Sequence, residues 1–177
     1  KVSGLNVGDK VFGMTGFNFG TYAEYITVNQ NSNVLKIPKN ATYEEAAAVI
    51  FGGQTAIYFL ENAKIHNRPY QKILIIGGTG SVGTAAIQLA KYYKADITAV
   101  CSSEGQTLAS ELGASNIILY DKEDFTKCED RFDIIFDAVG KSNRKQCKRL
   151  LKENGVYKSV NAVNAADTTQ QLQLLKD

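Results

Sequence analysis

The spacing of hydrophobic residues is clearest between residues 72 and 160. Lys72–Ile76 ends in four consecutive aliphatic residues, which is typical of a parallel strand covered on both faces. From Val82 to Tyr93, apolar residues recur at helical spacing. Strand and helix patterns continue to alternate along the chain. They predict strands at Asp96–Val100, Ile117–Leu119, Asp133–Phe136 and Gly155–Val160, and helices at Gln106–Leu112 and Ser142–Lys152. This order predicts an α/β fold with a doubly wound, mostly parallel sheet.

Residues 1–40 follow a different pattern, with glycines and polar residues between three short runs of β type. The runs are Lys10–Met14, Thr21–Val28 and Val34–Ile37. Alternation in the middle run predicts a half-buried antiparallel strand that places either Tyr22 or Tyr25 in the core. Three strands without closing partners leave unpaired edges, so we expect a fragment of a β module.

A helical region is expected between these two parts. Thr42 and Glu45 form a T-x-x-E capping box ahead of the apolar run Ala46–Phe51. Gly52-Gly53 is expected to interrupt the helix, which resumes over Thr55–Leu60. The sequence therefore predicts an interrupted helix ahead of the first buried strand.

Composition narrows the class of protein. Hydrophobic residues make up 44% of the 177, enough for a folded core. No apolar run approaches the roughly 18 residues of a membrane span, and no signal-peptide pattern opens the chain, so we expect a soluble, cytoplasmic protein without a membrane partner. A net charge of +2 argues against a nucleic-acid partner. Three scattered cysteines and one histidine predict a reducing compartment and no metal site.

The stretch that carries chemistry follows the first buried strand. Gly78, Gly80 and Gly83 form G-x-G-x-x-G between that strand and an amphipathic helix, the context that a dinucleotide-binding fingerprint requires. The glycines allow a tight turn, close approach of a pyrophosphate and close helix–sheet packing. The helix N-terminus offers free N–H groups and a positive dipole end to phosphates. We therefore expect a Rossmann domain; the alternative is a glycine turn that binds nothing.

The end of the second strand bears on the choice of coenzyme. NAD sites place an acidic residue about 20 residues after the motif, where it holds the ribose 2′-hydroxyl. Here the strand ends in the uncharged Cys101-Ser102-Ser103, whose hydroxyls could donate to a 2′-phosphate. Glu104 is close in sequence, and no Lys or Arg adjoins. On the missing acid, NADP(H) is favoured over NAD(H).

Several further segments follow one another in a specific order, although each alone is a loose pattern. They are V-G-D-K-V-F-G at 7–13, G-T-Y-A-E-Y at 20–25, K-I-P at 36–38, T-Y-E-E-A-A at 42–47, G-Q-T-A at 53–56, E-L-G-A at 111–114, F-D at 132–133, D-A-V-G at 137–140 and the stretch 151–157. In this order they resemble the medium-chain dehydrogenase/reductase superfamily, in its zinc-free quinone oxidoreductase-like and NAD(P)-dependent alcohol dehydrogenase-like branch. The resemblance implies a partial GroES-like β-barrel (substrate or catalytic) domain at residues 1–45 and a Rossmann dinucleotide-binding domain at residues 46–177.

Departures from the family pattern refine this expectation. Zinc-dependent relatives insert a four-cysteine lobe where this chain has only the seven residues Met14–Gly20. Phe51 stands where they carry a third catalytic-zinc ligand, and Gln106 replaces a basic residue that many NADPH-using relatives carry. Family members are also much longer, so we expect an interior fragment.

The resemblance implies roles for individual residues. The pyrophosphate would lie on Gly78, Thr79, Gly80, Ser81, Val82 and Gly83; Ser102, Ser103 and Tyr120 would surround the adenosine ribose and its phosphate; Thr55 would lie near the nicotinamide, Val139 and Gly140 would line the cofactor cleft, and Asn161 would approach the nicotinamide amide. No catalytic acid or base is nominated among these residues.

The expected function is a zinc-independent oxidoreductase that transfers hydride from NADPH to a quinone, an enone or an aldehyde. Its partners would be a small-molecule carbonyl or quinone substrate and, as the resemblance implies, a second copy in a homodimer paired through sheet edges. As a cofactor-binding fragment, the chain is expected to turn over poorly or not at all. The alternatives are a non-catalytic NADPH-binding module or sensor, an AdoMet-dependent methyltransferase and, least favoured, a zinc-dependent alcohol dehydrogenase.

Overall fold

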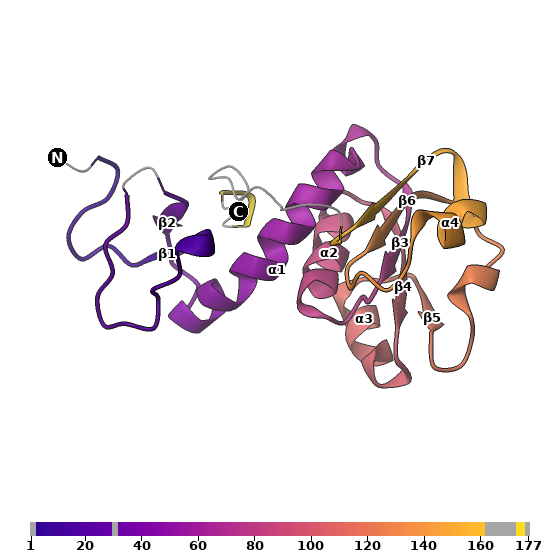
Figure 1. The fold of residues 1–177 in the computed structure, drawn as a ribbon, viewed down its shortest axis with the longest axis horizontal. Helices are drawn as coiled ribbons and strands as arrows, with labels where there is room; N and C mark the ends of the chain where they lie inside the picture. Colours follow the sequence, from indigo (N-terminus) through magenta and orange to yellow (C-terminus); the bar gives the residue numbers. More distant parts are fainter. Residues whose placement is uncertain (1–2, 30–31, 162–172, 176–177) are drawn as a thin grey trace.

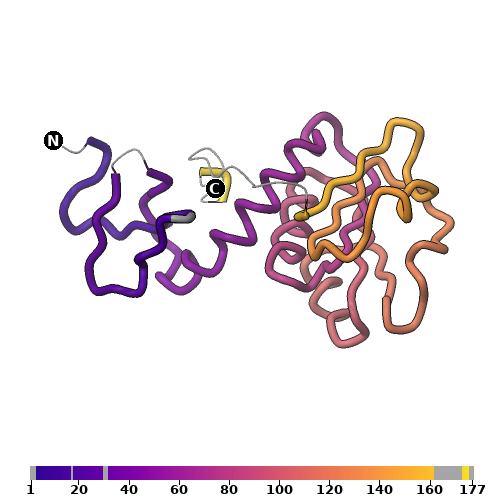
Figure 2. Tube along the Cα trace, in the orientation of Figure 1, coloured from indigo at the N-terminus to yellow at the C-terminus, as the bar shows by residue number. Residues whose placement is uncertain are grey.

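A computed structural model of the chain describes residues 3–29, 32–161 and 173–175. A two-stranded sheet lies near the N-terminus and a five-stranded sheet fills the second half, with the long helix α1 (Tyr43–Asn62) between them. Figures 1 and 2 show α1 running from the indigo N-terminal segment to the sheet at the other end of the molecule. The helix therefore belongs to both parts.

The large sheet confirms the parallel, doubly wound prediction. Its strands are β3 (Lys72–Ile76), β4 (Asp96–Cys101), β5 (Asn116–Leu119), β6 (Phe132–Asp137) and β7 (Leu151–Ser159). They lie in the order β5-β4-β3-β6-β7, and every neighbouring pair is parallel. The chain leaves β3 toward β4 on one side and later returns to pair β6 on its other side. In open α/β sheets, ligands bind at the carboxyl ends of the strands where the strand order reverses in this way.

Helices cover both faces of this sheet, which explains the continuous apolar character of β3. Ile73 and Ile75 face a core shared with α1, α2 (Ser81–Tyr92) and α3 (Gln106–Leu112). Leu74 and Ile76 face a second core, closed by α4 (Arg144–Cys147) and the following turn of 3-10 helix, η5 (Lys148–Leu150). Alternate residues of one strand therefore enter opposite cores, as a period of two requires.

The N-terminal part packs on the first half of α1. β1 (Val11–Gly13) and β2 (Val34–Lys36) pair antiparallel. Phe12 is buried against Ala46 and Ile50 of α1, in a small core that Leu175 also joins. The capping box starts α1 as predicted, because the Glu45 backbone N–H donates to Thr42 Oγ1 at 3.1 Å and the Thr42 N–H donates to Glu45 Oε2 at 2.8 Å.

Two sequence expectations are wrong, and a third holds only in part. Thr21–Val28 forms no strand, and Tyr22 and Tyr25 are both exposed, because β1 and β2 pair directly and no other described strand lies beside that run. Helix α1 is not interrupted at Gly52-Gly53. The basic helix expected over Ser142–Lys152 is limited to α4 and η5, since Asn143 caps a short helix with Gln146 and β7 already begins at Leu151.

The close packing around Gly52 and Gly53 explains why glycines stand in an uninterrupted helix. A side chain at Gly52 would come within 2.6 Å of Ser81 Oγ and still closer to the Ser81 carbonyl oxygen. A side chain at Gly53 would strike Leu175. The two glycines therefore allow α2 and Leu175 to pack closely on α1, and they do not break the helix. None of the helices in the described part of the chain is long and apolar enough to cross a membrane.

Candidate functional site

The glycine loop joins β3 to α2 and is shaped by close contacts. Gly77 has a φ of +80°, a conformation that favours glycine. A side chain at Gly83 would strike the Gly77 carbonyl oxygen, and one at Gly78 would lie 3.0 Å from Ala99 Cβ and 3.2 Å from Ile87 Cδ1. Three of the four glycines therefore serve the turn and the packing of α2 on the sheet.

Gly80 differs from the other glycines of the loop. Its φ of −78° and ψ of 169° suit any residue, and a Cβ there would meet only the Gly77 carbonyl oxygen, at an ordinary contact distance of 3.6 Å. Gly80 is the N-cap of α2, and no side chain caps this helix. The first N–H groups of a helix have no acceptor within the helix. The loop therefore leaves an open, uncapped helix N-terminus, which suits an anion.

The ends of the neighbouring strands surround this loop. The Gly77 and Gly78 N–H groups donate to the Val100 carbonyl at 2.9 and 3.0 Å, which joins the loop to the end of β4. Beyond β4, Ser102 leads into η3 (Ser103–Gly105), where Gly105 packs on the Thr79 side chain. The loop thus contacts the strand tip through backbone and side chain alike.

The other predicted residues lie around the same edge. The Tyr120 N–H donates to the Cys101 carbonyl at 3.0 Å. A side chain at Gly77 would strike Val139, and Asn161 Nδ2 donates to the Gly140 carbonyl at 2.8 Å. Thr55 is half-buried on α1, one turn after the glycine that contacts Ser81. Apart from Thr55, which lies on α1, the residues singled out from the sequence lie at the carboxyl ends of the strands, in the loops that follow them or in the first turn of α2; which of them touch a ligand stays a prediction.

Asp137, at the end of β6, is a residue that the sequence motif contains but that our reasoning did not single out. Its carboxylate is fully buried and accepts hydrogen bonds from the Gly140 N–H at 2.8 Å, from the Ser142 N–H at 2.7 Å and hydroxyl at 2.8 Å, and from the Tyr157 hydroxyl at 3.2 Å. This network ties the loop after β6 to the end of β6 and to Tyr157 of β7. A carboxylate directly after the apolar run Ile134–Phe136 was the signal that could have found it.

Asp121 is the second such residue, and it lies in the loop after β5. Its Oδ1 accepts from the Ser103 N–H at 2.9 Å and its Oδ2 from the Ser103 hydroxyl at 2.6 Å. The hydrogen bond from the Ser103 hydroxyl is the main reason why the pKa of Asp121 lies below its usual value. The residues Cys101, Ser102 and Ser103 are uncharged, but the carboxylate of Asp121, from the loop after β5, lies against Ser103.

Cys101, at the end of β4, is buried. Burial, and secondarily the charge of Asp121, raises the pKa of its thiol. Among residues 3–29, 32–161 and 173–175, no group of three or more His, Cys, Asp or Glu side chains could hold a metal ion. Phe51, at the position that resemblance assigned to a zinc ligand, offers no donor atom and is exposed. The described residues therefore do not fit zinc.

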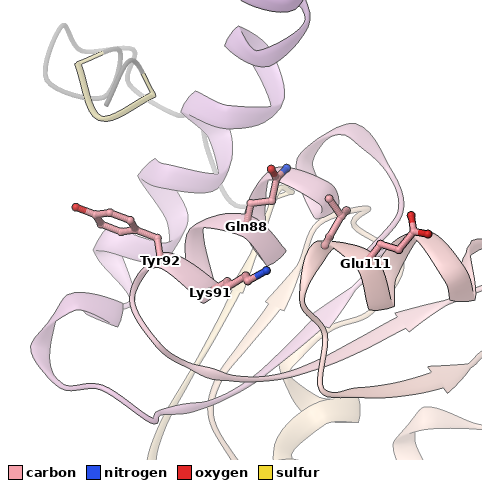
Figure 3. Close-up of a pocket in the computed structure, with 5 residues that line it drawn as sticks. Gln88, Lys91, Tyr92 and Glu111 are labelled. Carbon is pink, nitrogen blue, oxygen red and sulfur yellow. The ribbon is translucent and has the colours of Figure 1, made fainter. Parts of the chain in front are cut away.

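Two pockets lie away from the glycine loop. One pocket, of about 380 Å³, is lined by Gln88, Lys91, Tyr92, Glu111 and Leu112. Figure 3 shows its lining residues on the second half of α2 and the end of α3. A pocket of about 580 Å³ lies at the opposite edge of the sheet, where Gln71 and Asp133 mark the amino ends of β3 and β6. Neither of these two pockets contains a residue of the candidate site.

Comparison with known proteins adds an independent line of argument. Residues 81–176 match the family described as zinc-binding dehydrogenase. The 2-methylene-furan-3-one reductase of Solanum lycopersicum is 38% identical over 164 residues, which cover 88% of this chain and 41% of that protein. The chain thus spans well under half the length of that curated relative.

Two solved structures share the fold. The quinone oxidoreductase of Thermus thermophilus, whose structures include a complex with NADPH, is 28% identical with a TM-score of 0.63, over 74% of this chain and 44% of its own. An alcohol dehydrogenase superfamily protein from Novosphingobium aromaticivorans is 26% identical with a TM-score of 0.80, over 98% of this chain and 54% of its own. The second match includes the small N-terminal sheet as well as the large one.

Proposed function

This chain belongs to the zinc-binding dehydrogenase family, in the quinone oxidoreductase-like branch of the medium-chain dehydrogenase/reductase superfamily, and from that membership we propose that it is the coenzyme-binding part of an NADPH-dependent, zinc-independent oxidoreductase. Residues 1–45 would then belong to the substrate domain and residues 46–177 to the dinucleotide-binding domain. The activity, substrates and partners proposed here refer to the whole protein.

The observation that carries the proposal is the uncapped N-terminus of α2 behind a glycine that the fold does not require. Gly80 leaves space where a side chain would otherwise stand, next to N–H groups that a pyrophosphate would accept. The surrounding strand ends supply the remaining contacts. We assign the pyrophosphate to residues 78–83, the adenosine ribose to Ser102, Ser103 and Tyr120, and the nicotinamide side to Thr55, Val139, Gly140 and Asn161.

NADP(H) is proposed over NAD(H) for two reasons. Strand β4 ends without a carboxylate of its own, so the usual acceptor for the two ribose hydroxyls of NAD is missing. The Thermus relative has been solved with NADPH. The coenzyme supplies the hydride when bound, and the residues of this chain would bind it, orient it and exclude water from its reactive face.

The acceptor is proposed to be an electron-poor carbonyl compound, in the first place an enone or a quinone and otherwise an aldehyde. The tomato relative is named for reduction of an exocyclic enone, and the Thermus relative for quinones. Zinc independence rests on the described residues, which do not fit the metal, and on Phe51 at the position of a ligand. No acid or base among the described residues is assigned to catalysis.

Fluorescence titration with NADPH and NADH side by side tests the proposal. We expect saturable binding of NADPH that is tighter than binding of NADH and that AdoMet does not displace. Failure of both dinucleotides to bind would refute the proposed function. Equal affinity would refute the NADP(H) preference alone.

Turnover assays with an enone and with a quinone separate an enzyme from a binding module. They are run on the chain with and without the flanking segments of its gene. A module or sensor without catalysis would bind NADPH but transfer no hydride in either form. The proposed oxidoreductase is expected to oxidise NADPH when the flanking segments are present.

Location and assembly of the whole protein are part of the same proposal. We propose a cytoplasmic homodimer, paired through the outer edge of β7, where the described sheet ends. Size-exclusion chromatography with light scattering tests the dimer, and fractionation of cells tests the location. A strictly monomeric whole protein would contradict the first.

A further inference from the structure

Ser103, two residues beyond the end of β4, is held by a carboxylate from the loop after β5. Asp121, in the loop after β5, accepts from both donors of Ser103, the backbone N–H at 2.9 Å and the hydroxyl at 2.6 Å. Both hydrogen bonds are exposed to solvent. The serine that we assign to the 2′-phosphate of NADPH is therefore already occupied by an anion.

The place of this pair decides what it can influence. In a sheet of this topology, the carboxyl end of the strand next to the glycine loop is where the adenosine ribose is recognised. Gly105, two residues after Ser103, packs on Thr79 of the glycine loop, so the pair lies next to the proposed pyrophosphate site. A 2′-phosphate at this position would compete with Asp121 for the same donors.

We propose that Asp121 is a specificity-determining residue, which weakens the binding of a 2′-phosphate by occupying Ser103 and by repelling its charge. The inference rests on the proposed function. It names the residue that limits the NADPH preference of that same site. The effect requires that Asp121 be ionised at neutral pH, which agrees with the lowered pKa of its side chain.

The local charge balance supports this reading. The residues from Cys101 to Gln106 include one carboxylate, Glu104, and no Lys or Arg. Asp121 adds a second negative charge, and Lys122 beside it adds one positive charge. The tip and its contact residue therefore carry a net negative charge where a 2′-phosphate would add about two more.

The neutral variant Asp121→Asn tests the proposal. Its single amide oxygen can accept from the Ser103 N–H, but the second acceptor oxygen and the charge are gone, which frees the Ser103 hydroxyl. Because a phosphate with about two charges is repelled by one carboxylate across roughly 6 Å of water, we expect NADPH to bind about tenfold more tightly. NADH, which lacks the phosphate, is expected to change by less than about twofold.

Asp124→Asn is the matched control. Asp124 lies three residues further along the same loop and accepts from the N–H and the hydroxyl of Thr126 at 2.9 and 2.6 Å, with no contact to Ser103. It removes the same charge and the same type of hydrogen-bond pair, and it is expected to leave the ratio of the NADPH and NADH affinities near the wild-type value. Thermal unfolding of each variant shows that the fold is retained.

Two further measurements separate charge and contact from a structural effect. The gain in NADPH affinity is expected to shrink as ionic strength rises, because salt screens exposed charges. The double variant Asp121→Asn with Ser103→Ala is expected to lose part of the gain, because the freed hydroxyl is then missing. The inference is overturned if the ratio of the NADPH and NADH affinities is unchanged in Asp121→Asn, or if it changes equally in Asp124→Asn. In either case, NADPH binding by the wild type would still support the proposed function. A loss of NADH affinity without a gain for NADPH also overturns it, since Asp121 would then bind the ribose hydroxyls.

Discussion

Gly80→Ser separates what the fold needs from what the coenzyme needs. The backbone of Gly80, with φ −78° and ψ 169°, is open to any residue, and a Cβ there would make only an ordinary contact at 3.6 Å. Serine is a preferred N-cap residue because its hydroxyl accepts from the N–H groups of the first turn. We expect the variant to gain a few tenths of a kcal/mol in free energy of unfolding. For a chain of this length, the melting temperature would rise by about 1–2 °C.

Coenzyme binding should move in the opposite direction. The new hydroxyl would occupy an N–H group of α2 that the pyrophosphate is proposed to use, and its bulk would fill the open position at Gly80. A hydrogen bond between an N–H group and a charged oxygen contributes about 1.5–3 kcal/mol. The loss of one such bond corresponds to NADPH binding about 10- to 100-fold more weakly. The change is thus expected to stabilise the protein and weaken its ligand.

The assay pairs urea denaturation with fluorescence titration of NADPH on the same preparations. Thr42→Ala serves as the control with the opposite signature. It removes the cap of α1 at the end away from the large sheet, so it is expected to lose about 1 kcal/mol of stability without a change in Kd. If Gly80→Ser binds NADPH as tightly as the wild type, the pyrophosphate does not lie on this helix end. If Gly80→Ser lowers stability, our account of that glycine is wrong.

Three further predictions concern buried polar groups. Gln54 is buried on α1, and neither amide atom has a hydrogen-bond partner among the described residues. Gln54→Leu is therefore expected to raise the free energy of unfolding, measured by urea denaturation, by about 1–2 kcal/mol. A decrease would reveal a partner for the amide. Asp137→Asn replaces one acceptor oxygen with an N–H₂ donor that faces several donors. The variant is therefore expected to lose about 2–4 kcal/mol of stability and to bind NADPH more weakly. A variant as stable as the wild type would show that the network is dispensable. Burial raises the pKa of Asp133. Hydrogen bonds from Lys152 and the Lys72 N–H, together with the charges of Lys152 and Arg68, outweigh this effect, so the pKa of Asp133 lies below its usual value. Its contribution to stability is therefore present above the unfolded-state pKa and lost as pH falls through the folded-state value, so Asp133→Asn should narrow the stability difference between neutral pH and about pH 3, as measured by denaturation at both.

The large sheet could be predicted from the sequence because its signals are local. Lys72–Ile76 forms a strand with the predicted bounds, and Gln106–Leu112 forms a helix that ends at Gly113, whose φ of 118° is the left-handed conformation expected of a C-terminal glycine. The errors arose where tertiary contacts decide. The alternation in Thr21–Val28 is real, but a strand also needs a neighbour, and none of the described strands pairs with it. Gly52-Gly53 suggested a break because the sequence does not reveal the close crossing of α1 and α2.

The candidate site could be predicted only where its residues share one motif. Gly78, Gly80 and Gly83 stand at fixed spacing between a strand and a helix, so their role could be inferred without coordinates. Asp121 contacts Ser103 across 18 positions of sequence, from the loop of a neighbouring strand. A search for an acid at the end of β4 itself could not find it, since it reaches the strand tip from outside.

The two carboxylates at this edge of the sheet differ in how their charge is balanced. Asp137 is buried and its charge is met by backbone N–H groups and hydroxyls of its own loop, so replacing it should disturb the fold before it alters selectivity. Asp121 is exposed, accepts hydrogen bonds from Ser103 and has Lys122 beside it, so replacing it should alter the local charge and leave the cores intact. A buried charge without its partners is strongly destabilising, whereas an exposed pair contributes little to stability. We therefore expect that a substitution in the loop after β5 can change the proposed coenzyme preference without loss of the fold, whereas one in the loop after β6 cannot.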